Sequence, residues 1–220
     1  MNRSRHSREG EQRRDFIPKK KECNPRTTLG KKVISGEITS LESLLSKGIK
    51  ILEVEAIDYL VPDLKDRVLD ISSTQRMTSY GRKMKMRAVV VVGNSNGFVG
   101  VGVGKANDTK DAIASAVIEA KKNLVFVPLA CSSWECGCGS AHTIAQKSAG
   151  SSGNTRIELK PAPRGVGIVT NESAKTVLEF AGVKDTWATC TGRTRNVLNM
   201  VLSTINALKA LNKLKVGRNQ

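Results

Sequence analysis

Residues 89–127 constrain the fold more than any other stretch, because two strand patterns, a turn and a helix pattern follow one another without a break. Residues 89–92 are four valines, a β-branched run too short for a helix, and the Asn-Ser-Asn-Gly cluster at 94–97 is typical of a turn. Residues 98–104 then read as a return strand in which valine alternates with glycine. The stretch therefore predicts a β-hairpin that leads directly into a helix.

The return strand has two unlike faces, because successive side chains point to opposite sides of a strand. One face carries valines, whereas the other carries Gly100, Gly102 and Gly104 and is bare backbone. Glycine weakens a strand, so three on one face indicate that a helix, another protein or RNA approaches closely there. The helix that follows is predicted to begin at Asn107 or Asp108, and its apolar stripe comprises Ala112, Ile113, Ala116, Val117 and Ala120.

The chain is strongly basic, with a formal net charge of +16 over 220 residues. Such an excess points to a polyanionic partner, either nucleic acid or an anionic membrane surface. The charge is uneven: residues 37–70 carry eight acids against four bases, whereas no acid occurs from Thr186 onward. No apolar run approaches the roughly 20 residues that a spanning helix needs, so we expect no membrane partner. The five cysteines, an odd number, favour a reducing cytoplasm.

The N-terminal third divides into a basic and an acidic part. Residues 1–36 contain almost no periodic apolar residues, which predicts an arm that is disordered alone and becomes ordered along phosphates. Thr39 and Glu42 then have capping-box spacing at the start of a short helix, and a second apolar set runs from Ile51 to Pro62. Because this second part is acidic, we expect it to face away from nucleic acid or toward another basic protein.

Residues 76–87 hold five cations and no acid. Residues 74–83 predict a polar loop between a short strand at 68–71 and a second strand that begins at 83. Alternation places Lys83, Lys85 and Arg87 on one face of that second strand, beside a loop that contributes Arg76 and Arg82. Aromatic residues make up only 4% of the chain, so contact with phosphates and groove shape is favoured over base stacking.

The second half of the chain predicts a smaller α/β unit. Residues 128–140 break the periodicity like a linker, and residues 142–148 and 155–160 then flank a glycine-serine turn as a second hairpin. A helix closed by Gly182, a strand from Asp185 to Cys190 and a long final helix follow. Gly165 and Gly167 lack the Lys-Ser/Thr of a phosphate-binding loop, so they predict a tight turn.

One metal hypothesis arises from Cys131, Cys136, Cys138 and His142. Zinc ligands commonly come as cysteine pairs two to four residues apart, and only one Cys-x-Cys is present here, so reduced loop thiols are the favoured interpretation. We find no assembled set of acid, base and nucleophile that would indicate catalysis, and we expect neither an enzyme nor a cofactor.

Four stretches resemble the universal small-subunit ribosomal protein S-five family, known as S-two in eukaryotes. They are VVVVGNSNGFVGVGVGKA, EAKKNLVFVPL, LKPAPRGVGIV and VLEFAGVKD, and they occur in order across both halves of the chain. ECGCGSAHT and PAPRGVGIV are similar to the archaeal and eukaryotic branch rather than the bacterial one. The resemblance covers roughly residues 37–212.

The resemblance implies an α+β protein with a double-stranded-RNA-binding-like domain followed by a small α/β sandwich domain. We expect a basic arm at 1–36, the first domain at 37–128, a Cys/Gly linker at 129–140, the second domain at 141–214 and a basic tail at 215–220. It also implies a structural constituent of the small ribosomal subunit in the cytoplasm that binds ribosomal RNA, lies near the messenger RNA entry site beside ribosomal proteins S-three and S-four, and supports decoding accuracy.

Specific residues follow from combining charge with the resemblance. The expected RNA contacts are Arg76, Arg82, Lys83, Lys85, Arg87, Lys105, Arg164, Arg193 and Arg195. The region near the S-four partner matches Gly100, Gly102, Gly104, Asn107 and Lys110, so we expect a neighbouring protein or RNA against the glycine face. The alternatives are an RNA-processing enzyme that uses the second domain's glycine loop, or a free-standing double-stranded-RNA-binding module.

Overall fold

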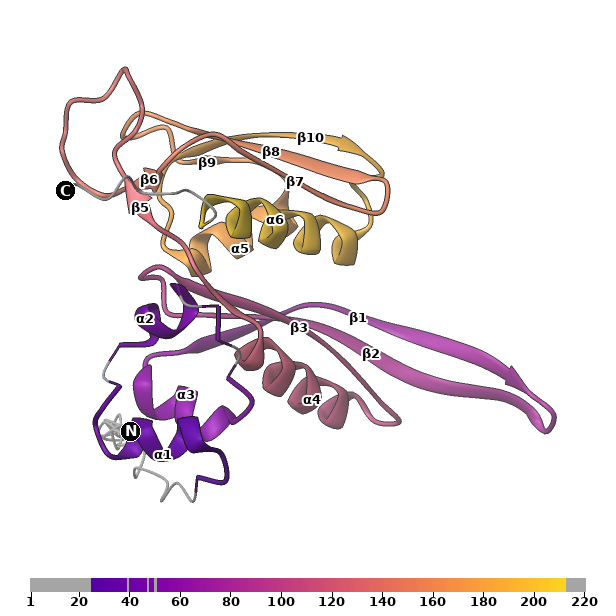
Figure 1. Cartoon of the computed structure of the whole chain (residues 1–220). Coiled ribbons are helices and arrows are strands. Elements are labelled where there is room, and N and C mark those ends of the chain that lie inside the picture. The colour runs from indigo at the N-terminus through magenta and orange to yellow at the C-terminus, as the bar shows by residue number, and fades with distance from the viewer. Residues whose placement is uncertain (1–24, 39, 47, 50, 213–220) are drawn as a thin grey trace, which may run out of the picture.

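The computed structural model describes residues 25–38, 40–46, 48–49 and 51–212. Within these residues, two four-stranded sheets and six helices form a mixed α+β fold (Figure 1). The layers run from the C-terminal four-stranded sheet through helices α5 (Glu172–Ala181) and α6 (Val197–Leu211) to the N-terminal four-stranded sheet and then to helix α4 (Thr109–Lys122). None of the helices in the described part of the chain combines the length and apolar run needed to cross a bilayer.

The first sheet has the strand order β1-β2-β3-β4, and all its neighbours are antiparallel. Its strands are β1 (Lys65–Thr78), β2 (Gly81–Gly93), β3 (Phe98–Ala106) and β4 (Leu124–Phe126). The predicted hairpin is confirmed by β2 and β3, in which Val91 lies opposite Val101. At its turn the Asn94 side-chain oxygen accepts hydrogen bonds from the backbone N–H groups of Asn96 and Phe98.

The glycine face of β3 is covered by α4 (Thr109–Lys122) from the same chain. A Cβ atom on Gly102 would fall on the backbone of Ala116 and Ala120, and a Cβ atom on Gly104 would fall on the backbone of Ala112 and Ala116. The expectation that another protein or RNA lies against Gly100, Gly102 and Gly104 is therefore wrong. The three glycines let a helix with a stripe of buried alanines approach the strand to backbone contact.

The opposite face of the first sheet packs against the C-terminal half of the chain. The second sheet has the order β7-β8-β10-β9, with β9 and β10 parallel, and α5 and α6 lie between the two sheets (Figure 1). Its elements are β7 (Ser148–Ser152), β8 (Thr155–Pro161), β9 (Ile168–Val169), α5 (Glu172–Ala181), β10 (Thr186–Gly192) and α6 (Val197–Leu211). One apolar cluster joins Val91 and Val101 of the first sheet to Leu178 and Leu208 of these helices.

Two hydrogen bonds fasten the first hairpin turn to the end of α5. The backbone N–H of Ser95 donates to the carbonyl of Phe180, and that of Gly97 donates to the carbonyl of Ala181. Gly182 ends α5 in the left-handed conformation, with φ of 87°, as predicted for the residue that closes this helix. These bonds tie the first sheet directly to α5, one of the helices that lie between the two sheets.

Three short helices precede the first sheet: α1 (Thr28–Ile34), α2 (Leu41–Ser46) and α3 (Val54–Leu60). Residues 28–34 were predicted to belong to a disordered arm, and α1 corrects that prediction. The Glu53 carboxylate accepts hydrogen bonds from the backbone N–H groups of Arg26 and Thr27, which fixes the start of α1. The remainder of the arm at 1–24, the proposed cap at Thr39 and the tail from 213 lie outside the described residues.

Three more predictions need correction. Residues 74–78, predicted as loop, belong to β1, because they pair in register with β2 through Thr78 opposite Gly81. Residues 129–140 are more than a linker, because β5 (Leu129–Ala130) pairs with β6 (Thr143–Ile144) and encloses the residues between them in a loop. The second hairpin exists as β7 and β8, but its first strand is residues 148–152 rather than the predicted 142–148, because residues 143–144 pair with β5 instead. The strand from Asp185 and the final helix are confirmed by β10 and α6.

Candidate nucleic-acid interface and cysteine–histidine cluster

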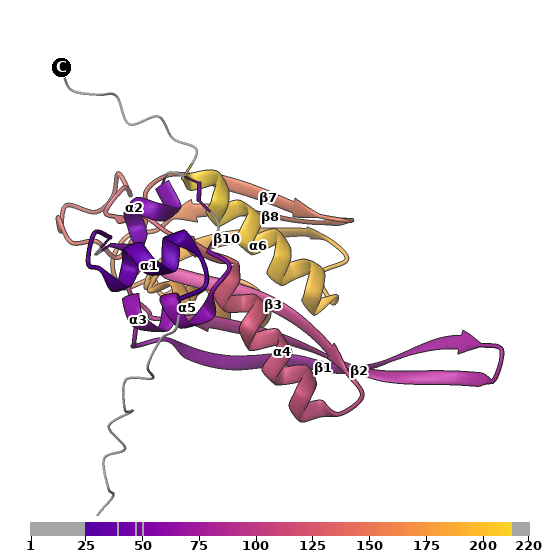
Figure 2. The ribbon, with the colours of Figure 1, turned by 60° about the horizontal axis from the view of Figure 1, so that its bottom comes forward.

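Strands β1 and β2 continue past the body of the protein as a two-stranded arm (Figures 1 and 2). Burial shows where the arm begins, because residues 88–93 of β2 are buried whereas residues 82–85 are exposed. Ser79 and Tyr80 form the turn at its tip, and Gly81 has a φ of 118°, which favours glycine. The Thr78 hydroxyl donates to the carbonyl of Gly81 over 2.7 Å and closes this turn.

The strand register gathers five cations on one face of the arm and its base. Arg76 lies opposite Lys83, and Arg87 lies opposite Lys105 of β3. Directly opposed residues share a face, and so do residues two apart in a strand. We call this set the cationic stripe: Arg76, Lys83, Lys85, Arg87 and Lys105.

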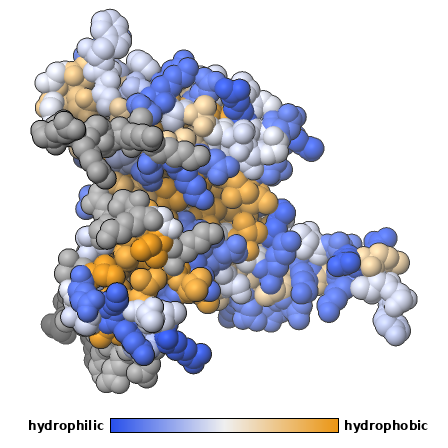
Figure 3. All heavy atoms as spheres, viewed as in Figure 1, coloured by the Kyte–Doolittle hydropathy of each residue, from blue (hydrophilic) through white to orange (hydrophobic). Residues whose placement is uncertain are grey.

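The cationic stripe is free to meet a partner. In the described part of the chain none of its five residues forms an ion pair with a carboxylate, and Arg87 Nε donates to Ser72 Oγ over 3.1 Å. A groove of about 550 Å³ runs along it, lined by Thr74, Gln75, Arg76, Thr78, Lys83, Lys85 and Lys105. Figure 3 shows hydrophilic residues along most of the arm. Unpaired cations in an open groove suit a phosphate backbone.

The other face of the arm is different. Arg82 lies opposite Met77, and Met84 lies opposite Gln75, so Arg82 is not part of the cationic stripe despite its position next to Lys83. Met77 is 73% exposed and Met84 is 54% exposed, while Tyr80 at the tip is fully exposed. These methionines were not among the predicted site residues, although the alternation Lys-Met-Lys-Met at 83–86 was the signal that separates the two faces.

Three further arginines were predicted to contact RNA, and they lie at two ends of the second sheet. Arg193 and Arg195 occupy the turn between β10 and α6, and that turn lies on the same side of the molecule as the arm in Figures 1 and 2. Arg164 follows β8 at the opposite end, because Thr155 pairs with Gly192 and Pro161 pairs with Thr186. Arg164 is therefore separated from the cationic stripe and lies beside the cysteine loop.

Asn107 and Lys110 remain predicted protein contacts. Both are exposed: Asn107 lies between Lys105 of the cationic stripe and α4, and Lys110 lies in the first turn of α4. Their backbone position places them at the same end of β3 as the base of the arm.

The four residues of the metal hypothesis converge in the loop between β5 and β6. The Sγ atoms of Cys131, Cys136 and Cys138 and one ring nitrogen of His142 all lie within 4.8 Å of one another. Cys131 Sγ is 3.5 Å from Cys138 Sγ, and Cys136 Sγ is 3.6 Å from His142 Nε2. Folding therefore brings together four side chains whose spacing in the sequence did not indicate a common site.

His142 is held from behind by a buried carboxylate. His142 Nδ1 lies 2.9 Å from Asp185 Oδ2, and both side chains are buried. Asp185 Oδ1 accepts hydrogen bonds from the backbone N–H groups of Gly165 and Gly167, at 3.0 and 2.8 Å. The predicted tight turn at 165–167 is thus tied to the cluster through Asp185, a residue that no sequence pattern connected with it.

Hydrogen bonds shift the pKa values of the three cysteine thiols in the cluster. The Ser140 hydroxyl lowers the pKa of the Cys138 thiol to about 6, and the backbone N–H of Arg164 lowers the pKa of the Cys136 thiol. The hydrogen bond with Cys138 raises the pKa of the Cys131 thiol.

The pKa of His142 and the pKa of Asp185 are shifted in opposite directions. Burial opposes their charged forms, but the hydrogen bond with Cys136 and the negative neighbours Cys138 and Asp185 raise the pKa of His142 above its ordinary value. The N–H groups of Gly167 and Gly165 hold the pKa of Asp185 below its ordinary value against the same effect of burial.

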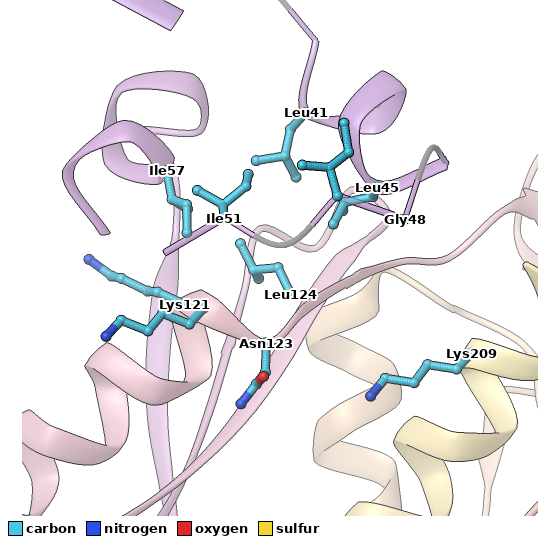
Figure 4. Close-up of a pocket in the computed structure, with 11 residues that line it drawn as sticks. Leu41, Leu45, Gly48, Ile51, Ile57, Lys121, Asn123, Leu124 and Lys209 are labelled. Atoms are coloured by element: carbon cyan, nitrogen blue, oxygen red, sulfur yellow. The ribbon is translucent and has the colours of Figure 1, made fainter. Parts of the chain in front are cut away.

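A separate pocket of about 180 Å³ lies between the N-terminal helices, the end of α4 and α6. Figure 4 shows Leu41, Leu45, Ile51, Ile57 and Leu124 gathered around it, with Lys121 and Lys209 on its sides. Lys121 Nζ forms an ion pair with Asp58 at 2.6 Å. None of the predicted RNA-contact or metal residues lines this pocket, so it is not the candidate site.

Comparison with known proteins places both halves of the chain in one family. Residues 64–128 match the family described as "Ribosomal protein S5, N-terminal domain", and residues 150–217 match "Ribosomal protein S5, C-terminal domain". The cysteine–histidine loop falls between these two matched segments.

Relatives that align over most of their own length and most of this chain have the same family description. The chain is 49% identical to the "Small ribosomal subunit protein uS5" of Methanoregula boonei over 201 residues, which span 91% of this chain and 98% of that protein. It is 49% identical to the protein of the same description from Methanocaldococcus jannaschii over 191 residues, spanning 87% and 88%. The Haloarcula marismortui protein of that description is 46% identical over 185 residues, spanning 84% and 87%.

Proposed function

The chain belongs to the ribosomal protein S5 family, and we propose that it acts in the small ribosomal subunit by binding ribosomal RNA through its cationic stripe. It is a structural component of the subunit rather than an enzyme, as the description of its relatives indicates. The observation that carries the proposal is the register of β1, β2 and β3, which places five cations on one face, four of them along an open groove, with no carboxylate partner among the described residues.

The proposed mechanism is electrostatic and steric. Cations along the groove neutralise crowded phosphates and release counterions, while the rigid layers behind them hold the RNA in one geometry. The arm suits this role because it extends away from the core, so RNA can pass along it without disturbing the packed sheets (Figure 2). Arg193 and Arg195 add positive charge on the same side of the molecule.

Finer details of the proposal rest on the family resemblance. They are a position near the messenger RNA entry site, contact with ribosomal protein S-four through Asn107 and Lys110, and support of decoding accuracy. The exposure of both residues beside the base of the arm is compatible with a protein neighbour there. Arg164 is proposed as a second, separate RNA contact at the far end of the second sheet.

The test reverses charge on the cationic stripe. Lys83→Glu with Lys85→Glu should weaken binding of the full chain to a small-subunit ribosomal RNA transcript, because two attractive contacts with phosphates become repulsive. The slope of log K against log salt should fall by about 0.7 to 0.9 for each phosphate that is no longer neutralised. The matched control is Lys160→Glu with Lys175→Glu, which changes the net charge equally at exposed positions on β8 and α5.

Two outcomes would contradict the proposal. One is a nearly flat salt dependence for the unmodified chain, and the other is equal loss of affinity in the stripe variant and the control. In cells, the stripe variant should also enter small subunits poorly or increase misreading. Tight binding of short RNA duplexes by a pool that does not sediment with small subunits would instead favour a free-standing RNA-binding module.

A further inference from the structure

We propose that Cys131, Cys136, Cys138 and His142 bind one zinc ion in a closed, structural site whose histidine is oriented by Asp185. Tetrahedral bonds of about 2.3 Å to sulfur and about 2.0 Å to nitrogen place neighbouring ligand atoms about 3.5 to 3.8 Å apart. In the structure, Cys131 Sγ lies 3.5 Å from Cys138 Sγ, and Cys136 Sγ lies 3.6 Å from His142 Nε2. These two separations match a tetrahedral zinc site, and all four ligand atoms lie within 4.8 Å of one another, so a bound ion would draw the cluster slightly closer together.

Backbone hydrogen bonds at the ends of the loop and at a turn within it bring the four ligands together. Pairing of β5 with β6 joins the two ends of the loop, and the backbone N–H of His142 donates to the carbonyl of Ala130. Between these ends the chain turns at Trp134, and the N–H of Cys136 donates to the carbonyl of Ser133. Trp134 is 92% exposed, so this large apolar side chain does not supply the loop with a core. A metal would supply the cross-link that apolar packing does not.

The surroundings of His142 are those of a metal ligand. In the neutral ring, the Asp185 carboxylate beside Nδ1 favours the tautomer with the proton on that nitrogen, which leaves the lone pair of Nε2 facing the cysteine sulfur atoms. A carboxylate behind the histidine is the usual arrangement at zinc sites, because it fixes both the tautomer and the ring orientation. Asp185 is itself fixed by the N–H groups of Gly165 and Gly167, and we regard it as a positioning residue.

Rival interpretations of the cluster explain less. A disulfide between Cys131 and Cys138 would not explain why Cys136 and His142 lie in the same cluster. The sulfur atoms of Cys131 and Cys138 are 3.5 Å apart, well beyond the roughly 2.05 Å of an S–S bond. Three sulfur ligands and one nitrogen favour zinc over magnesium or calcium, which prefer oxygen. Four protein ligands leave no open position, so the site is structural and not catalytic. The thiols bind as thiolates, and their protons pass to the solvent.

The first experiment measures metal in the unmodified full-length chain, purified under reducing conditions without chelator. Elemental analysis should find about one zinc per chain. After removal of zinc, Co²⁺ should produce the intense visible d–d bands and sulfur charge-transfer absorption of tetrahedral thiolate coordination. Absence of zinc together with absence of these bands, or a disulfide in the reduced preparation, would overturn the proposal.

Variants then assign the ligands. Cys136→Ser should lose the zinc and weaken the cobalt bands, whereas Cys190→Ser is the matched control, because Cys190 is a free cysteine in β10 outside the cluster. Equal zinc loss in both variants would overturn the assignment. Far-UV circular dichroism checks that each variant remains folded, and the cobalt spectrum of the unmodified chain does not depend on any variant.

The role of Asp185 has its own test. Asp185→Asn preserves the side-chain volume but removes the carboxylate, and it should weaken zinc affinity by about 10- to 100-fold in competition with a chromophoric chelator. Asp63→Asn, at an exposed position before β1, should leave the affinity unchanged. Unchanged affinity in the Asp185 variant would show that the carboxylate does not position the histidine. These readouts need no RNA, so they are independent of the proposed ribosomal function.

Discussion

At the scale of single residues, the glycines of β3 show how closely a helix can approach a sheet. A Cβ atom on Gly100, Gly102 or Gly104 would overlap backbone atoms of α4. The same arrangement recurs in the second sheet, where a Cβ atom on Gly150 of β7 would fall on the carbonyl oxygen of Ser203 and the backbone of Ala207 in α6. Both helix–sheet contacts therefore depend on glycine in the strand and on small residues in the helix.

Gly102→Ala should destabilise the protein, because the added methyl group meets the backbone of Ala116 and Ala120 rather than a side chain that could rotate away. Overpacking of this kind typically lowers the free energy of unfolding by about 1 to 3 kcal/mol. The measurement is the midpoint and slope of urea unfolding. Gly137→Ala is the control, since its added methyl group would meet no described atom within 4 Å and its φ is not in the left-handed region. Equal midpoints for the two variants would contradict the close-approach interpretation.

The alternation of Val and Gly at 98–104 was enough to predict both faces of β3, because strand periodicity is a local property. The occupant of the glycine face was not predicted correctly. Its signal was present in Ala112, Ala116 and Ala120, small residues at four-residue spacing that match a bare strand face. The cysteine cluster is the opposite case, because Asp185 and His142 are 43 residues apart and only the tertiary fold joins them.

At the scale of elements, the arm formed by β1 and β2 carries the candidate interface but little of the stability. Residues 82–85 are exposed, and a two-stranded hairpin without a covering layer gains little from burial. Residues 74–78 of the arm were predicted as loop because they are polar, whereas a strand in a folded protein usually has one apolar face. The strand forms instead because β2 supplies hydrogen-bonding partners in register, and both faces of the arm remain available to partners outside the chain.

Shortening the arm should separate function from folding. Residues 75–84 can be replaced with Asn-Gly, because Thr74 and Lys85 are directly opposed and a two-residue turn closes such a pair. The free energy of unfolding should change little, within about 0.5 kcal/mol, as for surface changes away from packed features. RNA affinity and its salt dependence should both fall, since Arg76 and Lys83 leave the cationic stripe. A large loss of stability, or unchanged RNA binding, would contradict this division of roles.

At the scale of the whole molecule, the two family segments share one apolar core. The first sheet presents Val91 and Val101 to α5 and α6, so it is covered on one face by its own α4 and on the other by the second domain. Sequence patterns predicted the elements of each half and their order, but they did not predict this contact, because an amphipathic face does not specify its partner. Because the two halves pack against each other, the β10–α6 turn, which contains Arg193 and Arg195, lies on the same side of the molecule as the arm.

Leu178→Ala should therefore loosen both halves together. Leu178 lies in α5, is fully buried and belongs to the shared core, and Leu→Ala changes at such positions cost about 2 to 5 kcal/mol. Hydrogen exchange measured by mass spectrometry should increase in residues 89–103 of the first hairpin as well as in α5 and α6. The control is Val90→Ala, whose side chain faces α4 in a different cluster and should affect α4 more than α5. If Leu178→Ala left the first hairpin as protected as before, the two sheets would be independent folding units, and their packing would not fix the arm relative to the β10–α6 turn.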